Sequence, residues 1–168
     1  MNTKTLYLKE IEQSDGDNVY EMFQEIPKAE LGSENMANGM SLKEFEKYKR
    51  KLVDNAKGEN LKKNETQKIN YIMYDDGYPV GGIALRLKLS EYWKKHSGHI
   101  GYSVRPSERG KGYGTKMLAL VLNEAKSRGI KEIYLQCNNK NLASQKVIEA
   151  NGGVRIKEDI SIYYTIYL

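Results

Sequence analysis

One stretch in the second half of the chain constrains the fold more than any other, because it has the pattern of a strand, a glycine-rich turn and a helix. His99 to Val104 contains β-branched and aromatic residues in a short run, which favours a strand, and Pro106 ends it. Three glycines at alternate positions follow: Gly110, Gly112 and Gly114. Glycine permits positive φ and lets backbone N–H groups come close to a ligand. Apolar residues then recur at helical spacing from Leu118 to Ala125. Free backbone N–H groups at a helix N-terminus predict a site for a phosphate or pyrophosphate.

The spacing of the glycines excludes two common phosphate-binding loops. A Walker-type loop and a dinucleotide-binding loop would each need a glycine five residues after Gly110, where Thr115 stands. The pattern that fits is Arg-x-x-Gly-x-Gly, formed by Arg109, Gly112 and Gly114. A glycine-rich turn without a ligand remains the alternative that this loop alone leaves open.

Length, charge and cysteine content limit the class of protein. The 168 residues are the length of one domain, and no apolar run is long enough to span a bilayer. A single cysteine, Cys137, excludes an intramolecular disulfide and fits a reducing, cytoplasmic compartment. The net charge of +5 suits an anionic ligand without requiring nucleic acid. The basic run from Lys47 to Lys51 is interrupted by acidic neighbours and is interpreted as a solvated helix face.

The remaining patterns predict the order of the elements. A first strand from Thr5 to Ile11 precedes a helix capped by Ser14 or Asp15, and a second helix begins at a capping box on Ser41. Residues 28–40 are expected to form a loop, and residues 88–97 a polar connection. Two strands of a hairpin, at 68–74 and 80–87, come before the central strand, and another strand follows the long helix at Ile133–Cys137. A last helix at 142–150 and two strands at 154–157 and 160–167 complete the order. We therefore expect a mixed α/β fold with a parallel pair around the central helix and antiparallel flanks.

Two motifs at this spacing resemble the GNAT superfamily of acetyl-CoA-dependent N-acetyltransferases. One is the Arg109–Gly114 loop, and the other is Asn141-Leu142-Ala143-Ser144 followed by Gly152. The resemblance is strongest from Gly81 to Gly152. It implies a mostly antiparallel central sheet of about seven strands with a splayed parallel pair and about four helices. It also implies one N-acetyltransferase domain over residues 1–168, with the acceptor side in 1–70 and the acetyl-CoA core in 71–168.

The resemblance further implies where acetyl-CoA binds. A backbone N–H near Ser103 or Val104 would donate to the acetyl oxygen, the loop would hold the pyrophosphate, and Asn141 and Ser144 would orient the pantetheine near the sulfur. The full set of implied cofactor residues is Tyr102, Ser103, Val104, Arg109, Gly110, Lys111, Gly112, Tyr113, Gly114, Thr115, Asn141 and Ser144. Lys111, Lys116 and Lys140 are candidate partners of the nucleotide phosphates, although solvated surface charge is the favoured interpretation of each.

In this family an amine attacks the thioester directly, so a proton must leave the amine and another must reach the thiolate. His99 is a candidate general base, with an equally weighted alternative as a structural histidine. The tyrosine that often serves as general acid is replaced by Ile148, so the acid would be Ser144, another tyrosine or water. Cys137 is expected to be a small apolar wall rather than a nucleophile.

The acceptor is expected to be a primary amine of a small molecule or a peptide. Four carboxylates on or after the first helix, Glu21, Glu25, Glu30 and Glu34, could attract a cationic amine, with ordinary surface charge as the favoured alternative. A catalytically silent acyl-CoA-binding sensor of the same fold is the second function that the sequence leaves open. No metal, nucleic acid or membrane partner is expected, and the chain would be a monomer or a homodimer.

Overall fold

The computed structural model describes residues 5–168, and these form nine strands, five α-helices and one 3-10 helix. In chain order the elements are β1 (Leu6–Glu10), α1 (Asp17–Glu25), β2 (Ala29–Glu30), β3 (Ser33–Glu34), α2 (Leu42–Lys57), β4 (Lys68–Asp75), β5 (Tyr78–Arg86), α3 (Glu91–His96), β6 (Ile100–Val104), η1 (Pro106–Glu108), α4 (Tyr113–Ser127), β7 (Glu132–Asn138), α5 (Leu142–Ala150), β8 (Val154–Glu158) and β9 (Ser161–Tyr167). The mixed α/β fold expected from the sequence is confirmed.

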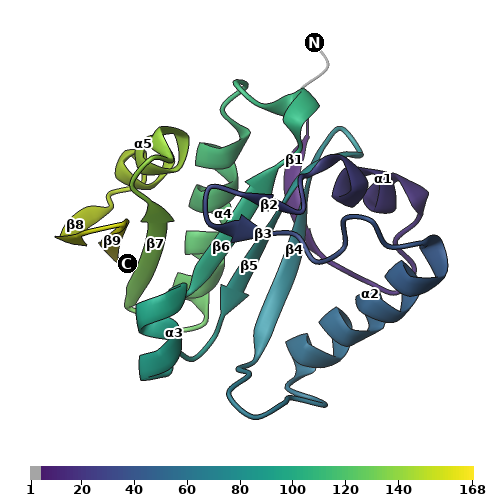
Figure 1. Cartoon of the computed structure of the whole chain (residues 1–168), viewed down its shortest axis with the longest axis horizontal. Coiled ribbons are helices and arrows are strands. Elements are labelled where there is room, and N and C mark those ends of the chain that lie inside the picture. Colours follow the sequence, from purple (N-terminus) through teal and green to yellow (C-terminus); the bar gives the residue numbers. More distant parts are fainter. Residues whose placement is uncertain (1–4) are drawn as a thin grey trace.

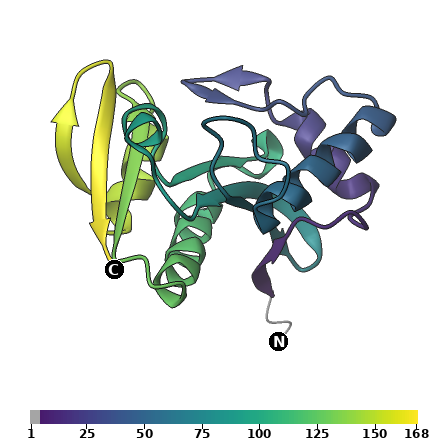
Figure 2. The same cartoon turned by 90° about the horizontal axis from the view of Figure 1, so that it is seen from below.

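The long strands form two antiparallel sheets, one in the order β1-β4-β5-β6 and the other in the order β7-β9-β8 (Figure 1). Helix α4 packs on β5, β6 and β1, whereas α1 packs on β5 and α2 on β4. Alternate residues of β4 divide between two apolar clusters: Tyr71 and Met73 pack with α4, and Ile72 and Tyr74 pack with α1 and α2. Because alternate strand residues point to opposite faces, α4 covers one face of the four-stranded sheet and α1 and α2 cover the other (Figure 2).

Within residues 5–168, backbone pairing joins the two sheets at one point, which we call the vertex. It consists of one bridge between Gly98 and Leu135 and a hydrogen bond of 2.7 Å from the His99 N–H to the Tyr134 carbonyl. A Cβ on Gly98 would lie 2.3 Å from the Tyr134 carbonyl oxygen, so only glycine allows the two backbones to come this close. Beyond the vertex, β6 and β7 each form an edge of their own sheet.

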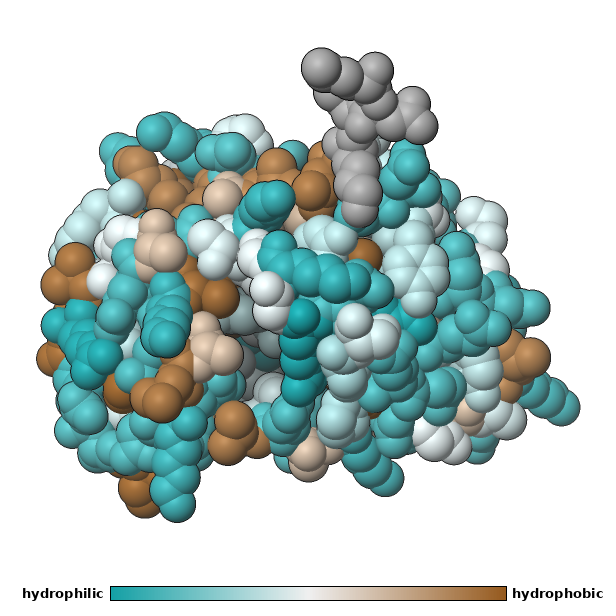
Figure 3. All heavy atoms as spheres, turned by 90° about the horizontal axis from the view of Figure 1, so that it is seen from above, coloured by the Kyte–Doolittle hydropathy of each residue, from teal (hydrophilic) through white to brown (hydrophobic). Residues whose placement is uncertain are grey.

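We call the space between these two edges the β6–β7 gap. The single central sheet expected from the sequence is thus divided into two at this gap. Among the described residues no parallel ladder joins β6 and β7, and the one bridge between the two sheets is of the antiparallel type. Seen from above, the surface is hollowed between the side that carries α5, β8 and β9 and the side that carries α1 and α2 (Figure 3).

The expected seven strands correspond to the two large sheets, and the structure adds three short elements. The segment expected to be a loop contains the hairpin of β2 and β3, and the polar connection contains α3. Strands of two residues and a helix of six are too short to show a hydrophobic period, so the sequence pattern could not reveal them.

Two local predictions near the N-terminus are wrong and one is confirmed. Asp15 does not cap α1, because its carboxylate accepts from the Glu12 N–H at 2.7 Å and from Lys9 at 2.6 Å, and the helix begins two residues later. Lys49, in the basic run, is buried: its Nζ donates to the carbonyl of Gln13 at 3.0 Å and to that of Asp15. The capping box on Ser41 is present as expected.

Candidate functional site

The turn before α4 is an open loop of left-handed glycines. Gly112, the N-cap residue of α4, has φ of 79°, and Gly110 has φ of 78°. A Cβ at either position would meet nothing within 4 Å, so these glycines are required by the backbone conformation and not by crowding. A left-handed conformation costs other residues roughly 1–2 kcal/mol. The loop therefore leaves the N-terminal N–H groups of a 15-residue helix open to solvent, where an anion is favoured.

The first turn of α4 uses its residues differently from the loop. The Tyr113 side chain turns into the core, where its hydroxyl donates to Asp75, and this hydrogen bond raises the pKa of Tyr113 to about 12. A Cβ on Gly114 would lie 3.2 Å from Cγ2 of Val147, so this glycine lets α4 and α5 pack closely. Asn151, which follows the last residue of α5, donates to the carbonyl of Thr115 in the first turn of α4 at 3.2 Å. Tyr113 and Gly114 can thus serve a ligand only through their backbone.

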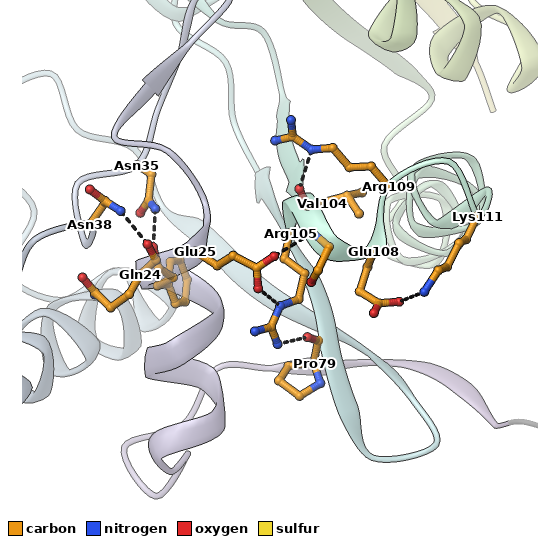
Figure 4. A network of polar contacts seen from close by, with 12 residues as sticks. Gln24, Glu25, Asn35, Asn38, Pro79, Val104, Arg105, Glu108, Arg109 and Lys111 are labelled. Carbon is orange, nitrogen blue, oxygen red and sulfur yellow. Dashed lines mark hydrogen bonds and ion pairs between the residues drawn. The ribbon is translucent and has the colours of Figure 1, made fainter.

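Carboxylates hold the cations of the loop. The guanidinium of Arg109 forms two hydrogen bonds to Glu30 of the β2–β3 hairpin, at 2.9 and 2.7 Å, which lower the pKa of the Glu30 carboxyl. The Arg109 Nε also donates to the Val104 carbonyl at 3.1 Å, and Lys111 pairs with Glu108 at 2.7 Å (Figure 4). Lys116 and Lys140 are exposed. These bonds use three of the five guanidinium N–H groups, so Glu30 would compete with a phosphate on this loop for the Arg109 side chain.

Glu25 connects α1 to the segment that follows β6. Its carboxylate accepts from Arg105 at 2.6 Å and from the Ser107 N–H at 2.6 Å, and Arg105 also donates to the Pro79 carbonyl at 3.1 Å (Figure 4). Although burial acts to raise the pKa of Glu25, the bonds from Ser107 and Arg105 lower it. Of the four carboxylates considered for an acceptor, Glu25 and Glu30 are thus engaged with arginines, while Glu21 and Glu34 are exposed.

The register of β6 shows which backbone groups face the β6–β7 gap. The Arg105 N–H donates to the Val80 carbonyl at 2.9 Å, and Ser103 lies opposite Gly82. Since hydrogen-bonded and non-bonded positions alternate in an antiparallel ladder, Ser103 points its backbone groups toward β5, and Val104 points its own toward the gap. Of the two residues expected to supply a donor to an acetyl oxygen, the register therefore favours Val104.

His99 lies at the vertex and is buried, with 7% of its surface exposed. Its Nδ1 accepts from the Tyr134 N–H at 2.9 Å, and the two rings stack with centroids 5.9 Å apart. Burial lowers the pKa of His99 to about 4, so the ring is neutral near pH 7 and a weak base. This geometry favours the structural alternative for His99 over a role as general base.

A group of polar side chains from three elements lies at the β6–β7 gap. The Tyr102 hydroxyl of β6 is 2.7 Å from the Ser144 Oγ of α5, and Asn141 caps α5 by accepting from the Ser144 N–H at 3.1 Å. Cys137, near the end of β7, is 8% exposed, and burial raises the pKa of its thiol. Ile148 is buried in the core. The sequence predicts Tyr102 as a cofactor-binding residue. It does not predict the contact between Tyr102 and Ser144, because 42 residues separate the two.

Within residues 5–168, no three His, Cys, Asp or Glu side chains gather in a way that could hold a metal ion. In the same part of the chain, no helix combines the length and apolar character needed to cross a membrane.

Comparison with known proteins places this geometry in a family. No curated protein matches the chain. A ribosomal L7/L12 alpha-N-protein acetyltransferase in complex with coenzyme A shares the fold with a TM-score of 0.75 at 17% identity, over 98% of this chain and 94% of the other. A ribosomal-protein-S5-alanine acetyltransferase from Vibrio fischeri has a TM-score of 0.70 at 17% identity, over 99% and 95%. The N-acetyltransferase PseH of Campylobacter jejuni, in complex with acetyl coenzyme A, has a TM-score of 0.66 at 13% identity, over 97% and 99%.

A sequence model described as the acetyltransferase (GNAT) family matches residues 20–152, which is most of the chain. The matched residues include the open loop, the outer edge of β6 and the helix α5. On this match and the shared fold, the chain belongs to the acetyltransferase (GNAT) family.

Proposed function

We propose that this chain transfers an acetyl group from acetyl-CoA to a primary amine of a small molecule or peptide, by direct attack of the amine in a ternary complex. One observation carries the proposal. The open glycine loop comes shortly after β6 in the chain, and the unpaired edge of β6 faces the β6–β7 gap. An anion site and a backbone donor for a carbonyl oxygen therefore lie along one path, as the two ends of acetyl-CoA require.

The residues of the site divide the binding of acetyl-CoA among them. The N–H groups of the loop and of the first turn of α4 would hold the pyrophosphate, and Arg109 would exchange Glu30 for a phosphate oxygen. The Val104 N–H would donate to the acetyl oxygen. That oxygen gains negative charge when the amine attacks, so the hydrogen bond strengthens in the transition state and accelerates the reaction.

The neutral, buried His99 bears on the class of amine. With a pKa of about 4, His99 would accept a proton from an ammonium group poorly. An α-amino group, with an ordinary pKa of about 7.7–8.0, is partly neutral at pH 7, whereas a lysine amine at about 10.4 is almost wholly charged. We therefore favour the α-amine of a peptide or protein as acceptor and water as proton acceptor. The alpha-N-protein acetyltransferase of the same fold supports this choice.

A catalytically silent acyl-CoA-binding sensor is the second candidate, and one observation favours it. Ile148 is buried at the position where the family often has its acidic tyrosine. A sensor would keep the pyrophosphate loop and lose the proton donor.

The deciding experiment measures binding and turnover separately. The purified protein is titrated with acetyl-CoA and then assayed for release of the CoA thiol with a panel of peptides, amino acids, polyamines and aminoglycosides. We expect binding and turnover, with peptides bearing a free N-terminus preferred over their N-terminally blocked, lysine-containing counterparts. Binding without thiol release across the panel would support the sensor, and failure to bind acetyl-CoA would reject both functions.

A further inference from the structure

The buried isoleucine at position 148 raises the question of which hydroxyl group serves the leaving thiolate. Two of the buried tyrosines are committed elsewhere: Tyr113 donates to Asp75, and Tyr164 donates to Glu149 at 3.1 Å. Tyr102 differs from both, because its partner is the hydroxyl of Ser144 and not a carboxylate.

The contact between Tyr102 and Ser144 spans the β6–β7 gap. Tyr102 lies on β6 in the four-stranded sheet, and Ser144 lies in the first turn of α5, beyond β7, with 2.7 Å between the two oxygens. The Ser144 N–H is held by the Asn141 side chain, so the serine backbone is fixed at the start of the helix. The two hydroxyls are thus held together by elements on both sides of the gap.

The two hydroxyl protons of this pair determine the direction in which a proton can be passed along it. Each hydroxyl has one proton to donate and an oxygen that can accept. When Tyr102 donates to the Ser144 Oγ, the serine proton is left to donate to a third atom. Burial raises the pKa of Tyr102 to about 12, so the phenol carries its proton throughout the neutral range.

We propose that Tyr102 is a positioning residue that directs the Ser144 hydroxyl at the leaving sulfur of acetyl-CoA and resupplies its proton. This inference rests on the proposed acetyltransferase function and assigns its missing acid to a pair of hydroxyls.

Every proton in the proposed step has a donor and an acceptor. The amine nitrogen bonds to the carbonyl carbon, and the carbon–sulfur bond breaks with its electron pair going to sulfur. The Ser144 proton moves to that sulfur, which leaves as the CoA thiol, and the Tyr102 proton moves to the serine oxygen. The proton lost by the amine returns to the phenolate through water, so no other reactant is needed.

The test compares Tyr102→Phe, Ser144→Ala and the double variant, with acetyl-CoA and the best amine of the panel. Tyr102→Phe keeps the partly buried ring, so we expect KM for acetyl-CoA within about twofold of wild type and kcat lower by about 10- to 100-fold. The double variant should be no slower than Ser144→Ala, since the tyrosine acts only through the serine. Tyr164→Phe removes a hydroxyl that donates to Glu149 instead, and should keep the wild-type kcat.

A measurement on the wild-type enzyme alone completes the test. The rate in mixtures of light and heavy water should show two protons moving in the chemical step, and a single-proton dependence would overturn the relay. A wild-type kcat in Tyr102→Phe, or losses that simply multiply in the double variant, would also overturn it while leaving the acetyltransferase function intact. If the wild-type protein binds acetyl-CoA but turns over no amine, the inference fails together with the proposed function.

Discussion

In the proposed complex with acetyl-CoA, Arg109 is the residue of the site whose partner would change. In this structure its guanidinium is held by Glu30 through two hydrogen bonds, and both side chains are about 40% exposed. Half-exposed ion pairs contribute up to about 1 kcal/mol, which corresponds to roughly a fivefold change in an equilibrium constant. Glu30 therefore competes modestly with a pyrophosphate for the same donor.

The first prediction removes this competitor. Glu30→Gln should lower the Kd for CoA by about two- to fivefold, measured by calorimetric titration. Glu34→Gln is the matched control, because Glu34 lies in the same hairpin, is exposed, and loses the same charge. Equal affinities in the two variants would show that Arg109 keeps Glu30 when CoA binds.

The second prediction concerns His99 and the pH dependence of stability. Burial lowers the pKa of His99 to about 4 in the folded chain, against about 6.5 when unfolded. Its contribution is therefore complete above pH 6.5 and is lost as the pH falls toward 4. Between pH 7 and pH 5 the loss amounts to about 2 kcal/mol in the free energy of unfolding.

Urea unfolding of the wild type and of His99→Asn at pH 7 and pH 5 measures this contribution of His99 to the free energy of unfolding. The wild type should lose about 2 kcal/mol more than the variant between pH 7 and pH 5, since asparagine does not titrate. An identical pH dependence in the two proteins would mean that His99 is protonated as readily in the folded state as in the unfolded one.

At this scale, local patterns predict turns and caps, the cap of α1 excepted, whereas they do not predict distant partners. The left-handed glycines of the loop and the Ser41 capping box follow from neighbouring residues, and the structure has both. Glu30 and Arg109 are 79 residues apart, so no local signal joins them. The buried state of His99 likewise depends on Tyr134, which only the tertiary fold places beside it.

At the scale of elements, α4 offers a matched pair of glycines at its two ends. Gly112 and Gly129 both have φ of 79°, and a Cβ on either would meet nothing within 4 Å. Valine at either position should therefore cost a similar 1–2 kcal/mol of stability. Only Gly112 lies at the N-terminal end of the helix, where the pyrophosphate is proposed to bind.

The third prediction follows from this pair. Gly112→Val should weaken acetyl-CoA binding by tenfold or more, because the side chain would stand where the pyrophosphate approaches, while Gly129→Val should bind as the wild type does. Titration with acetyl-CoA measures both, and chemical unfolding checks that their stabilities match. Tight binding by a folded Gly112→Val protein would place the pyrophosphate elsewhere.

Helix α2 supplies the fourth prediction. The Lys49 side chain is buried, with 2% of its surface exposed, and its ammonium contacts Glu46 at 2.8 Å and the carbonyls of Gln13 and Asp15 after β1. Removing it leaves these acceptors without a donor, so Lys49→Ala should lower the free energy of unfolding by about 2–3 kcal/mol. The exposed Lys47 of the same helix is the control, and Lys47→Ala should change stability by less than about 0.5 kcal/mol. Equal urea midpoints would contradict this role.

Lys49 also shows why a sequence pattern predicts that α2 is a helix more reliably than it predicts which of its side chains are buried. The spacing of apolar residues and the cap determined its extent, from Leu42 to Lys57. A lysine counts as polar in such a pattern. The burial of Lys49 is favourable because the loop between β1 and α1 provides the carbonyls that its ammonium contacts.

At the scale of the whole molecule, acetyl-CoA would join the two sheets across the β6–β7 gap. The fifth prediction is a rise in thermal stability with ligand, by about 2.7 kcal/mol at a free concentration 100 times the Kd. A thermal shift assay measures it, with Gly112→Val as the variant that should show a much smaller shift. A ligand that binds without raising the melting temperature would not be binding to the folded state alone. The order of elements predicted the long strands, but as one central sheet; their division into two sheets depends on the close backbone contact at the vertex, which no sequence pattern reveals.

The meeting point at Gly98 is a pivot between the two sheets. A point four residues along β6 or β7 lies roughly 13 Å from the pivot, so a rotation of about 10° there opens the far end by roughly 2 Å, more than the length of one methylene group. A side chain at position 98 would push the two strands apart at the vertex, because a Cβ would lie 2.3 Å from the Tyr134 carbonyl oxygen. Under the proposed function, the room for an acyl group between β6 and β7 would therefore depend on a glycine at the opposite end of the gap.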